Sequence, residues 1–276
     1  MSTVQGDDQD LTRKQRRERA RAKRRELEQA QAASALRRTR LTQLGIVTVI
    51  VIAIIIGIVV ATSGGSKSGL RTKPSERSAV VTAVSSLIGG IPQNGNTLGS
   101  PTAPVTLQYF GDLECPVCRE FTLGALKPLI ENYVRPGKLK VEYRSFETAT
   151  RERETFSTQQ VAALAAGKQQ KAWYYIELFY HQQGEENTGY VTESYLQGLA
   201  QQVPGLNLAK WASDRSDAEL ATAVTATDPQ AANNFGFSGT PSFAIAKTGT
   251  PPKKLEVASF TDPTSFETAI EGLAKR

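Results

Sequence analysis

The stretch YFGDLECPVCREF, residues 109–121, contains both cysteines of this 276-residue chain, Cys115 and Cys118. Two sulfurs separated by two residues could form a small structural disulfide, supply half of a metal site, or act as a reversible redox pair. The surrounding sequence discriminates among these possibilities, because each of them needs a different local structure.

The cysteine pair lies between a predicted strand and a predicted helix. Residues 104–110 (PVTLQYF) alternate well enough for a buried strand. After the first cysteine, apolar side chains recur at helical spacing, and Pro128 is expected to kink this helix. A second alternating strand follows at residues 137–146 and completes a strand–helix–strand unit with parallel strands. A Cys-x-x-Cys that opens the helix of such a unit is typical of a thioredoxin-like redox site.

The position at a helix N-terminus predicts different roles for the two thiols. Free backbone N–H groups and the helix dipole stabilise a thiolate there, and such settings lower a thiol pKa from about 8.5 to roughly 3.5–7.5. Cys115 is therefore predicted to be the exposed nucleophile and Cys118 the more buried thiol that resolves a mixed disulfide. Pro116 suits the first helical turn, because no N–H is needed at that position.

A structural metal site is not expected. Such sites use four Cys or His ligands, whereas this chain has two cysteines and one histidine, His181, which we interpret as a surface or edge residue of a distant helix. A purely structural disulfide is the other alternative. It would close hardly any loop, so it would remove little entropy from the unfolded chain.

The rest of the domain is predicted to contain a block of helices followed by two strands and a helix. The block spans about residues 153–235; within it, residues 161–183 are interpreted as one helix, and Ser216 with Glu219 as a capping box. The later elements are expected at residues 241–246, at residues 254–258 and from residue 262 onward.

The net charge of the chain is concentrated at its N-terminus. Residues 1–43 hold twelve Lys or Arg and six Asp or Glu. This excess of six equals the net charge of the whole chain, so the remainder is balanced. We interpret the segment as a solvated basic cytoplasmic tail, and we expect no nucleic-acid binding because aromatic residues are not interleaved with its charges.

A candidate membrane anchor follows this tail. Residues 44–61 (LGIVTVIVIAIIIGIVVA) are 18 uncharged residues, enough to cross the hydrocarbon core of a bilayer. Because arginines precede the span, the positive-inside rule predicts a single-pass cell-membrane protein with a cytoplasmic N-terminus and an extracytoplasmic catalytic domain. A cleaved signal peptide is the alternative. Residues 62–97 are interpreted as an extracytoplasmic linker, and the domain is expected to span residues 98–276.

Two stretches of the domain resemble a known family. Residues 92–121 and the later FGFSGTPSFAIA, residues 235–246, are similar to the membrane-anchored or secreted DsbA-like thiol–disulfide oxidoreductases of bacteria, particularly actinobacterial ones. The resemblance extends over roughly residues 90–276. It implies an α/β thioredoxin-like fold with an inserted helical subdomain. It also implies that Pro241 follows a cis peptide bond and faces the two cysteines, with Thr240 beside it, so that this loop binds the substrate strand.

The resemblance also implies an activity. Such proteins exchange disulfides with unfolded or reduced secreted and envelope proteins, most simply by oxidising them, and need no bound cofactor beyond the Cys115–Cys118 disulfide. Turnover then requires a membrane redox partner, a quinone-linked membrane protein, that reoxidises the pair.

One position departs from the strongest oxidases of the family, which have a histidine where this chain has Val117. Valine provides neither a hydrogen bond nor a positive charge, and the carboxylates of Glu114 and Asp112 add negative charge nearby. The Cys115 thiolate is therefore expected to be less stabilised and the disulfide less oxidising. A disulfide isomerase or reductase using the same site is one alternative. A membrane-tethered binding or chaperone module without redox turnover is the alternative from another class.

Overall fold

The computed structural model describes residues 70–71 and 73–275, except for the side chains of residues 229 and 232. The predicted tail at residues 1–43 and the predicted membrane span at residues 44–61 lie outside the described residues, so both stay predictions. Within the described part, no helix is both long enough and apolar enough to cross a bilayer.

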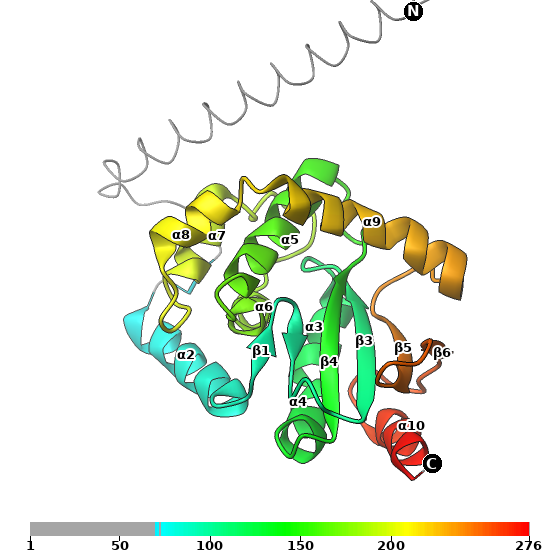
Figure 1. Cartoon of the computed structure of the whole chain (residues 1–276). Coiled ribbons are helices and arrows are strands. Elements are labelled where there is room, and N and C mark those ends of the chain that lie inside the picture. The colour runs from blue at the N-terminus through cyan, green and yellow to red at the C-terminus, as the bar shows by residue number, and fades with distance from the viewer. Residues whose placement is uncertain (1–69, 72, 276) are drawn as a thin grey trace, which may run out of the picture. The chain divides into compact units, whose positions relative to one another are not determined.

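In the described part of the chain, six strands form one sheet in the order β1-β2-β4-β3-β5-β6 (Figure 1). The strands are β1 (Gln93–Asn94), β2 (Thr97–Leu98), β3 (Val105–Gly111), β4 (Leu139–Ser145), β5 (Ser242–Lys247) and β6 (Lys253–Leu255). β3 and β4 pair in parallel, and the other neighbouring strands pair antiparallel. Parallel strands need a crossover connection, which here contains α3 (Pro116–Leu123), so the predicted strand–helix–strand unit is confirmed.

The helix that follows the cysteines is interrupted, as Pro128 led us to expect. α3 ends at Leu123, with Gly124 as its C-cap, and the short α4 (Leu126–Leu129) contains Pro128 and leads directly into a π-helical turn at Ile130–Val134. Since proline has no N–H to donate, the regular hydrogen-bond ladder cannot pass through this position.

One face of the sheet forms an aromatic core beneath the cysteines. Tyr109 of β3 is fully buried and packs edge-on against Phe121 of α3, with the ring centroids 4.8 Å apart, while it stacks on Phe243 of β5 at 5.7 Å. A Cβ at Gly111 would lie 2.8 Å from the Tyr143 ring. Glycine is therefore needed where β3 meets this aromatic cluster, because no other residue leaves room for the ring.

The opposite face of the sheet is covered at one end by α9 (Ala218–Phe235), which crosses the top of the domain in Figure 1. Phe110 of β3 packs there with Phe146, Phe237 and Ala231 in a second, smaller cluster. The rest of this face carries polar side chains along an open groove, among them Thr106, Gln108, Lys140 and Glu142. The covered end of the sheet is the end at which β3 delivers the cysteines.

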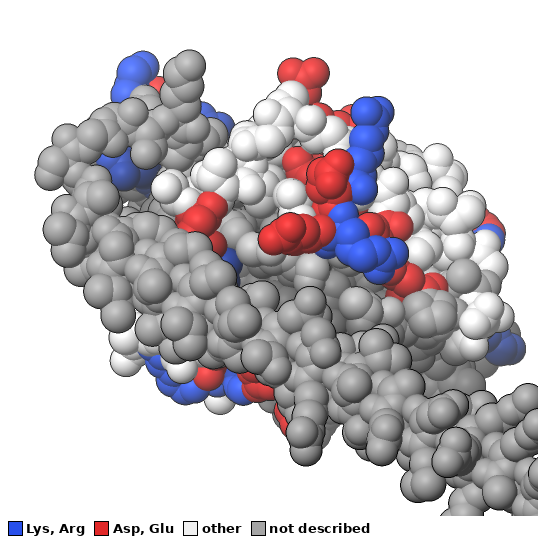
Figure 2. Space-filling view, turned by 90° about the horizontal axis from the view of Figure 1, so that it is seen from above, with Lys and Arg blue, Asp and Glu red and all other residues white. Residues whose placement is uncertain are grey.

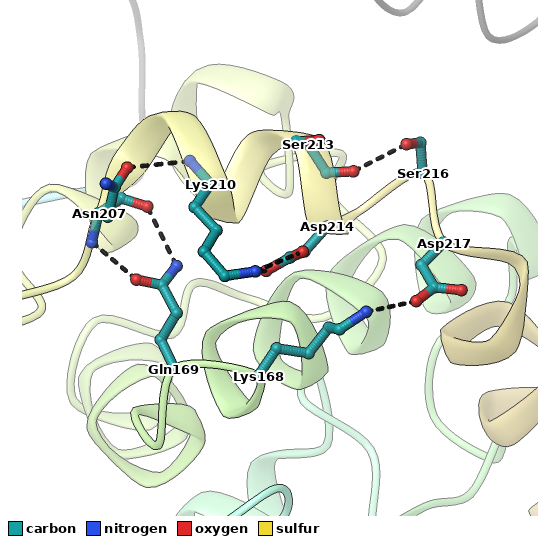
Figure 3. A network of polar contacts seen from close by, with 8 residues as sticks. All are labelled: Lys168, Gln169, Asn207, Lys210, Ser213, Asp214, Ser216 and Asp217. Atoms are coloured by element: carbon teal, nitrogen blue, oxygen red, sulfur yellow. Dashed lines mark hydrogen bonds and ion pairs between the residues drawn. The ribbon is translucent and has the colours of Figure 1, made fainter.

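Five helices lie between β4 and β5 and form the predicted helical insertion. They are α5 (Arg153–Gly167), α6 (Ala172–His181), α7 (Glu193–Ala200), α8 (Leu208–Asp214) and α9. Trp211 of α8 stacks on Tyr175 of α6, and its indole N–H donates to the Ala162 carbonyl of α5 at 2.8 Å. At the surface, Gln169 and Asn207 exchange two hydrogen bonds, and Lys168 pairs with Asp217 (Figure 3). The insertion is thus one packed unit.

Residues 161–183 do not form the single helix that their composition suggested. α5 stops at Gly167, and α6 starts only at Ala172. A Cβ at Gly167 would lie 2.7 Å from the Gly95 carbonyl oxygen in the β1–β2 turn, and Gln170 takes a left-handed conformation with φ of 61°. The chain turns here because it packs against that hairpin.

The predicted capping box at Ser216 and Glu219 was also wrong. The Ser216 hydroxyl donates to the Ser213 carbonyl at the end of α8 (Figure 3). The carboxylate of Asp217 instead accepts from the Glu219 backbone N–H at 2.9 Å and caps the start of α9. The neighbouring residue thus serves the same purpose.

The predicted linker at residues 62–97 was wrong from residue 74 onward. Residues Pro74–Ile88 form α2, which lies against α6 beside the β1 edge of the sheet (Figure 1). Val84 and Ile88 are fully buried in the main core, and the Arg135 guanidinium donates to three carbonyls at the C-terminus of α2. The domain therefore begins well before residue 98.

The helices at the two ends of the domain, α2 and α10 (Thr264–Ala274), pack against different parts of it. α2 covers the insertion, whereas α10 packs on β3 and β5 with Phe266 and Ile270 buried. Charges outside the cores are mixed: on the face shown in Figure 2, Asp and Glu side chains lie beside Lys and Arg side chains. This mixture agrees with the balanced composition of the chain after residue 43.

Candidate active site

Cys115 is the N-cap residue of α3, and Pro116 is the first residue of the helix. The Cys115 Sγ accepts a hydrogen bond from the Cys118 backbone N–H at 3.3 Å. The pKa of Cys115 is lowered to about 7, mainly by a hydrogen bond from the Cys118 thiol, with contributions from the Thr240 side chain and the backbone N–H groups of Cys118 and Val117, against the opposing effect of burial. The Cys118 thiol is thus the main group that stabilises the thiolate, and the N–H groups at the helix N-terminus, which the sequence predicted for this role, add a smaller contribution.

Cys118 lies in the opposite environment. It has no exposed surface, and burial is the largest cause that raises its pKa well above the usual value. Cys115 is itself 4% exposed, less than we predicted, but it is the more accessible of the two. Both cysteines are free thiols here. At neutral pH the pair thus combines a partly ionised nucleophile with a buried thiol that donates to it.

The loop before β5 lies directly beside the nucleophile. The Thr240–Pro241 peptide bond is cis, as the family resemblance implied. The Cys115 Sγ donates to the Thr240 carbonyl oxygen at 3.3 Å, although 125 residues separate them in sequence. The pairing of Phe110 with Ser242 places the carboxyl end of β3 beside the start of β5, which explains this meeting.

The three residues predicted to tune the redox chemistry lie in different surroundings. Pro116 is exposed and Val117 is half-buried, and the Val117 side chain offers the sulfurs no polar group. Glu114 is buried, and its carboxylate accepts from the Asn187 backbone N–H at 3.2 Å. Burial raises the pKa of Glu114. Its carboxylate therefore has its partner in the loop after α6, where it also lines a cavity of 280 Å³.

Asp112 is a site residue whose role the sequence did not reveal. Its side chain is fully buried at the end of β3. Six donors surround the carboxylate: the backbone N–H groups of Glu114, Thr148, Ala149 and Thr150, the Thr150 hydroxyl and the Gln159 amide. A carboxylate with this many donors fixes the backbone around it. The charge that we expected to act on Cys115 is directed at the loop after β4.

The helical insertion holds the cysteine loop from the other side. The Gln183 amide, just after α6, donates to the carbonyl oxygens of Leu113 at 2.7 Å and of Cys115 at 3.0 Å. These contacts join residues about 70 apart in sequence, and no motif marks Gln183. His181, in the same region, is the last residue of α6 and is half-buried, which agrees with the predicted edge position.

Below Cys118 the interior is polar but uncharged. The Tyr109 hydroxyl lies 3.4 Å from the Cys118 carbonyl oxygen and donates to the Tyr180 hydroxyl at 3.1 Å. The Tyr180 hydroxyl in turn donates to the Asp112 carbonyl oxygen at 3.1 Å. Among the described residues, no group of three or more His, Cys, Asp or Glu side chains is placed to hold a metal ion.

Two curated proteins are similar over most of their length. The probable disulfide bond formation protein D of Bacillus anthracis is 26% identical over 207 residues, which is 75% of this chain and 88% of that protein. The protein of the same name from Bacillus cereus is 25% identical over 213 residues, 76% of this chain and 90% of the relative.

Solved structures show the same fold. Oxidised BdbD from Bacillus subtilis superposes with a TM-score of 0.55 at 19% identity and covers 69% of this chain and 99% of its own. Alpha-DsbA1 from Wolbachia pipientis gives a TM-score of 0.55 at 17% identity, covering 65% of this chain and 90% of its own. The thioredoxin-like fold with a helical insertion is therefore confirmed.

A family model described as thioredoxin matches residues 93–258. The match includes the Cys-x-x-Cys, the helical insertion and the cis-proline loop, and it covers more than half of the chain. This chain is therefore a member of that thioredoxin family.

Proposed function

We propose that this protein is a thiol–disulfide oxidoreductase that introduces disulfide bonds into secreted or envelope proteins by exchange at Cys115 and Cys118. The observation that carries the proposal is the contrast between the two thiols beside the cis-proline loop. The pKa of Cys115 is lowered to about 7 while that of Cys118 is raised, and the Cys115 sulfur lies 3.3 Å from the Thr240 carbonyl. The similar disulfide bond formation proteins support the same reaction class.

The exchange follows from this contrast. A substrate thiolate attacks the Cys115 sulfur of the oxidised pair. A bond forms between the substrate sulfur and the Cys115 sulfur, the Cys115–Cys118 bond breaks, and Cys118 takes up a proton. A second substrate thiolate then attacks the substrate sulfur of the mixed disulfide and releases Cys115 as a thiolate. Two electrons pass from the substrate to the pair. The lowered pKa of Cys115 makes it the better leaving group in the second step.

The loop at Thr240 and Pro241 is the proposed docking site for the substrate strand. The Thr240 carbonyl oxygen lies beside the nucleophile and accepts a hydrogen bond from the Cys115 thiol. An extended substrate segment can pair with this backbone edge. Such pairing holds the substrate cysteine next to Cys115.

Turnover requires a membrane redox partner that reoxidises the reduced pair. A location outside the cytoplasmic membrane, with residues 44–61 as the anchor, belongs to the proposal because the apolar span and the preceding arginines support it. Protease added to cells whose wall has been removed but whose membrane is intact should digest the domain. Digestion only after lysis would contradict this location.

A disulfide isomerase or reductase is the second candidate. The observation that favours it is Val117, whose side chain adds nothing to thiolate stabilisation, together with a Cys115 pKa near the upper end of the range for reactive thiols. Equilibration with glutathione separates the two candidates. A potential near about −120 mV supports the oxidase, whereas one near about −270 mV supports the reductase.

The proposed function is tested by replacing the resolving thiol in the full-length protein. With Cys118→Ser, the mixed disulfide at Cys115 cannot be resolved from within the site, so covalent complexes with exported proteins should accumulate and disappear on reduction. Cys115→Ser is the matched control and should trap nothing. If Cys118→Ser traps nothing and Cys115→Ser keeps its biological activity, the protein is a binding or chaperone module instead.

A further inference from the structure

The loop after β4, residues 146–150, is anchored by the buried carboxylate of Asp112. Oδ2 of Asp112 accepts from the backbone N–H groups of Thr148 at 3.2 Å, Ala149 at 2.9 Å and Thr150 at 2.9 Å. Oδ1 accepts from the Thr150 hydroxyl at 2.6 Å. Charge-assisted hydrogen bonds to several consecutive N–H groups leave this loop little freedom. Thr148 is therefore presented from a fixed backbone.

Thr148 connects this loop to the cis-proline loop. Its Oγ1 lies 2.6 Å from the Oγ1 of Thr240, 92 residues further along the chain. Thr148 is an exposed residue, so the pair of hydroxyls lies at the surface where a substrate would arrive.

Thr240 is in turn the neighbour of the nucleophile. Its carbonyl oxygen accepts from the Cys115 thiol, and its side chain is one of the groups that lower the pKa of Cys115. A hydroxyl has one hydrogen to donate. When Thr148 donates to the Thr240 oxygen, the Thr240 hydrogen is free to point at the Cys115 sulfur. When the Thr148 hydroxyl is absent, nothing fixes that orientation.

These contacts close into a ring. The Cys115 backbone N–H donates to the Asp112 carbonyl oxygen at 3.0 Å, and the Cys115 thiol, while protonated, donates to the Thr240 carbonyl oxygen. In that form the chain of hydrogen bonds runs from Asp112 through Thr148 and Thr240 to Cys115 and back to Asp112. The buried residue Asp112 thus binds both the backbone of Cys115 and the loop that carries Thr148.

We propose that Thr148, held in place by Asp112, is a positioning residue that orients the Thr240 hydroxyl toward the Cys115 sulfur and so stabilises its thiolate. The proposal deepens the proposed function and rests on it for its physiological meaning. The ring itself can be tested without any substrate.

The test replaces the exposed hydroxyl and follows the ionisation of Cys115. In the reduced full-length protein, the rate of alkylation by iodoacetamide is measured from pH 5 to 10. With Thr148→Val, the midpoint should rise by about half a unit to one unit, so that the rate at pH 7 falls about two- to fivefold. Thr148→Ser keeps a hydroxyl and should restore the midpoint of the original protein.

The chain provides a matched control at the other end of the same two strands. Thr106 Oγ1 of β3 lies 2.8 Å from Thr248 Oγ1, just after β5. Thr106→Val removes an equivalent hydroxyl pair far from the cysteines and should leave the midpoint unchanged. Asp112→Asn should raise the midpoint at least as much as Thr148→Val, but it also weakens the fold, so Thr148 carries the test.

The proposal is overturned if Thr148→Val leaves the midpoint unchanged, if Thr148→Ser shifts it as much as valine does, or if Thr106→Val produces the same shift. These results leave the proposed function intact when Cys118→Ser still traps exported proteins. Conversely, a failure of Cys118→Ser to trap substrates removes the proposed function but leaves the alkylation result readable. The two failures are therefore distinguishable.

Discussion

At the scale of single residues, the difference between Cys115 and Cys118 arises from where each sulfur lies and from its hydrogen bonds. Cys115 gains hydrogen bonds from Cys118 and from the backbone of α3, and Cys118 loses contact with water. The side chain of Val117 contributes to neither effect. A side chain at position 117 that reaches the sulfur can therefore change the redox balance of the pair.

Val117→His should lower the pKa of Cys115 and make the disulfide more oxidising. A positive imidazolium near the thiolate favours the charged form, and an opposite charge at close range typically lowers a pKa by about one to three units. Iodoacetamide alkylation against pH gives the first quantity, and equilibration with glutathione gives the second. Val117→Thr is the neutral control of similar shape. An unchanged midpoint in Val117→His would show that this side chain does not reach the sulfur.

The chemical residues of the site were predictable only where a short motif carries them. Cys115, Cys118 and Pro241 stand in such motifs. Asp112 adjoins the motif, but its partners Thr148 and Thr150 lie 36 and 38 residues away in an irregular loop. Gln183 is 68 residues from Cys115. Loop residues have no periodicity, so their contacts depend on the assembled fold.

At the scale of secondary-structure elements, periodicity predicted the central strands and the order of the elements. It failed where a neighbouring segment decides the outcome. Gly167 ends α5 because the chain there touches the β1–β2 turn, a contact that no local pattern encodes. α2 was assigned to a linker because glycine and serine surround it, although its apolar residues Val80, Val84 and Ile88 lie on one side of a helix. Only the packing of α2 against α6 identifies that side as part of the core.

Val84→Ala should destabilise the domain by about 1–3 kcal/mol, because a fully buried side chain loses two methyl groups and leaves a cavity. Urea unfolding followed by tryptophan fluorescence measures the change. Thr82→Ala, on the exposed side of the same helix, is the control and should change stability by less than about 0.5 kcal/mol. Equal stability of the two variants would mean that α2 does not pack on the domain and that the linker prediction holds.

At the scale of the whole molecule, ionisation of the active site is linked to stability. The pKa of Cys115 is lowered from 9.0 to about 7 in the folded protein, so the folded state favours the thiolate. This contribution is complete above about pH 9 and is lost as the pH falls through about 7. The raised pKa of Cys118 acts in the opposite sense, but only above the pKa of an unfolded thiol, near 9.0. Cys115 therefore dominates between pH 7 and 9.

The reduced protein should accordingly gain thermal stability relative to reduced Cys115→Ser as the pH rises from 6 to 8.5. Subtracting the two melting temperatures at each pH removes the effects of all other titrating groups, since both proteins share them. A difference that does not vary with pH would mean that the folded and unfolded states hold the Cys115 proton equally well.

The meeting of Cys115 with Thr240 across 125 residues also has a consequence for biosynthesis. A ribosome makes the chain from its N-terminus, so the two cysteines emerge long before the strand that completes their site. During that interval the newborn chain carries both thiols without the cis-proline loop that lies beside Cys115 in the folded protein. The surroundings that distinguish Cys115 from an ordinary thiol can therefore form only after Thr240 has been synthesised.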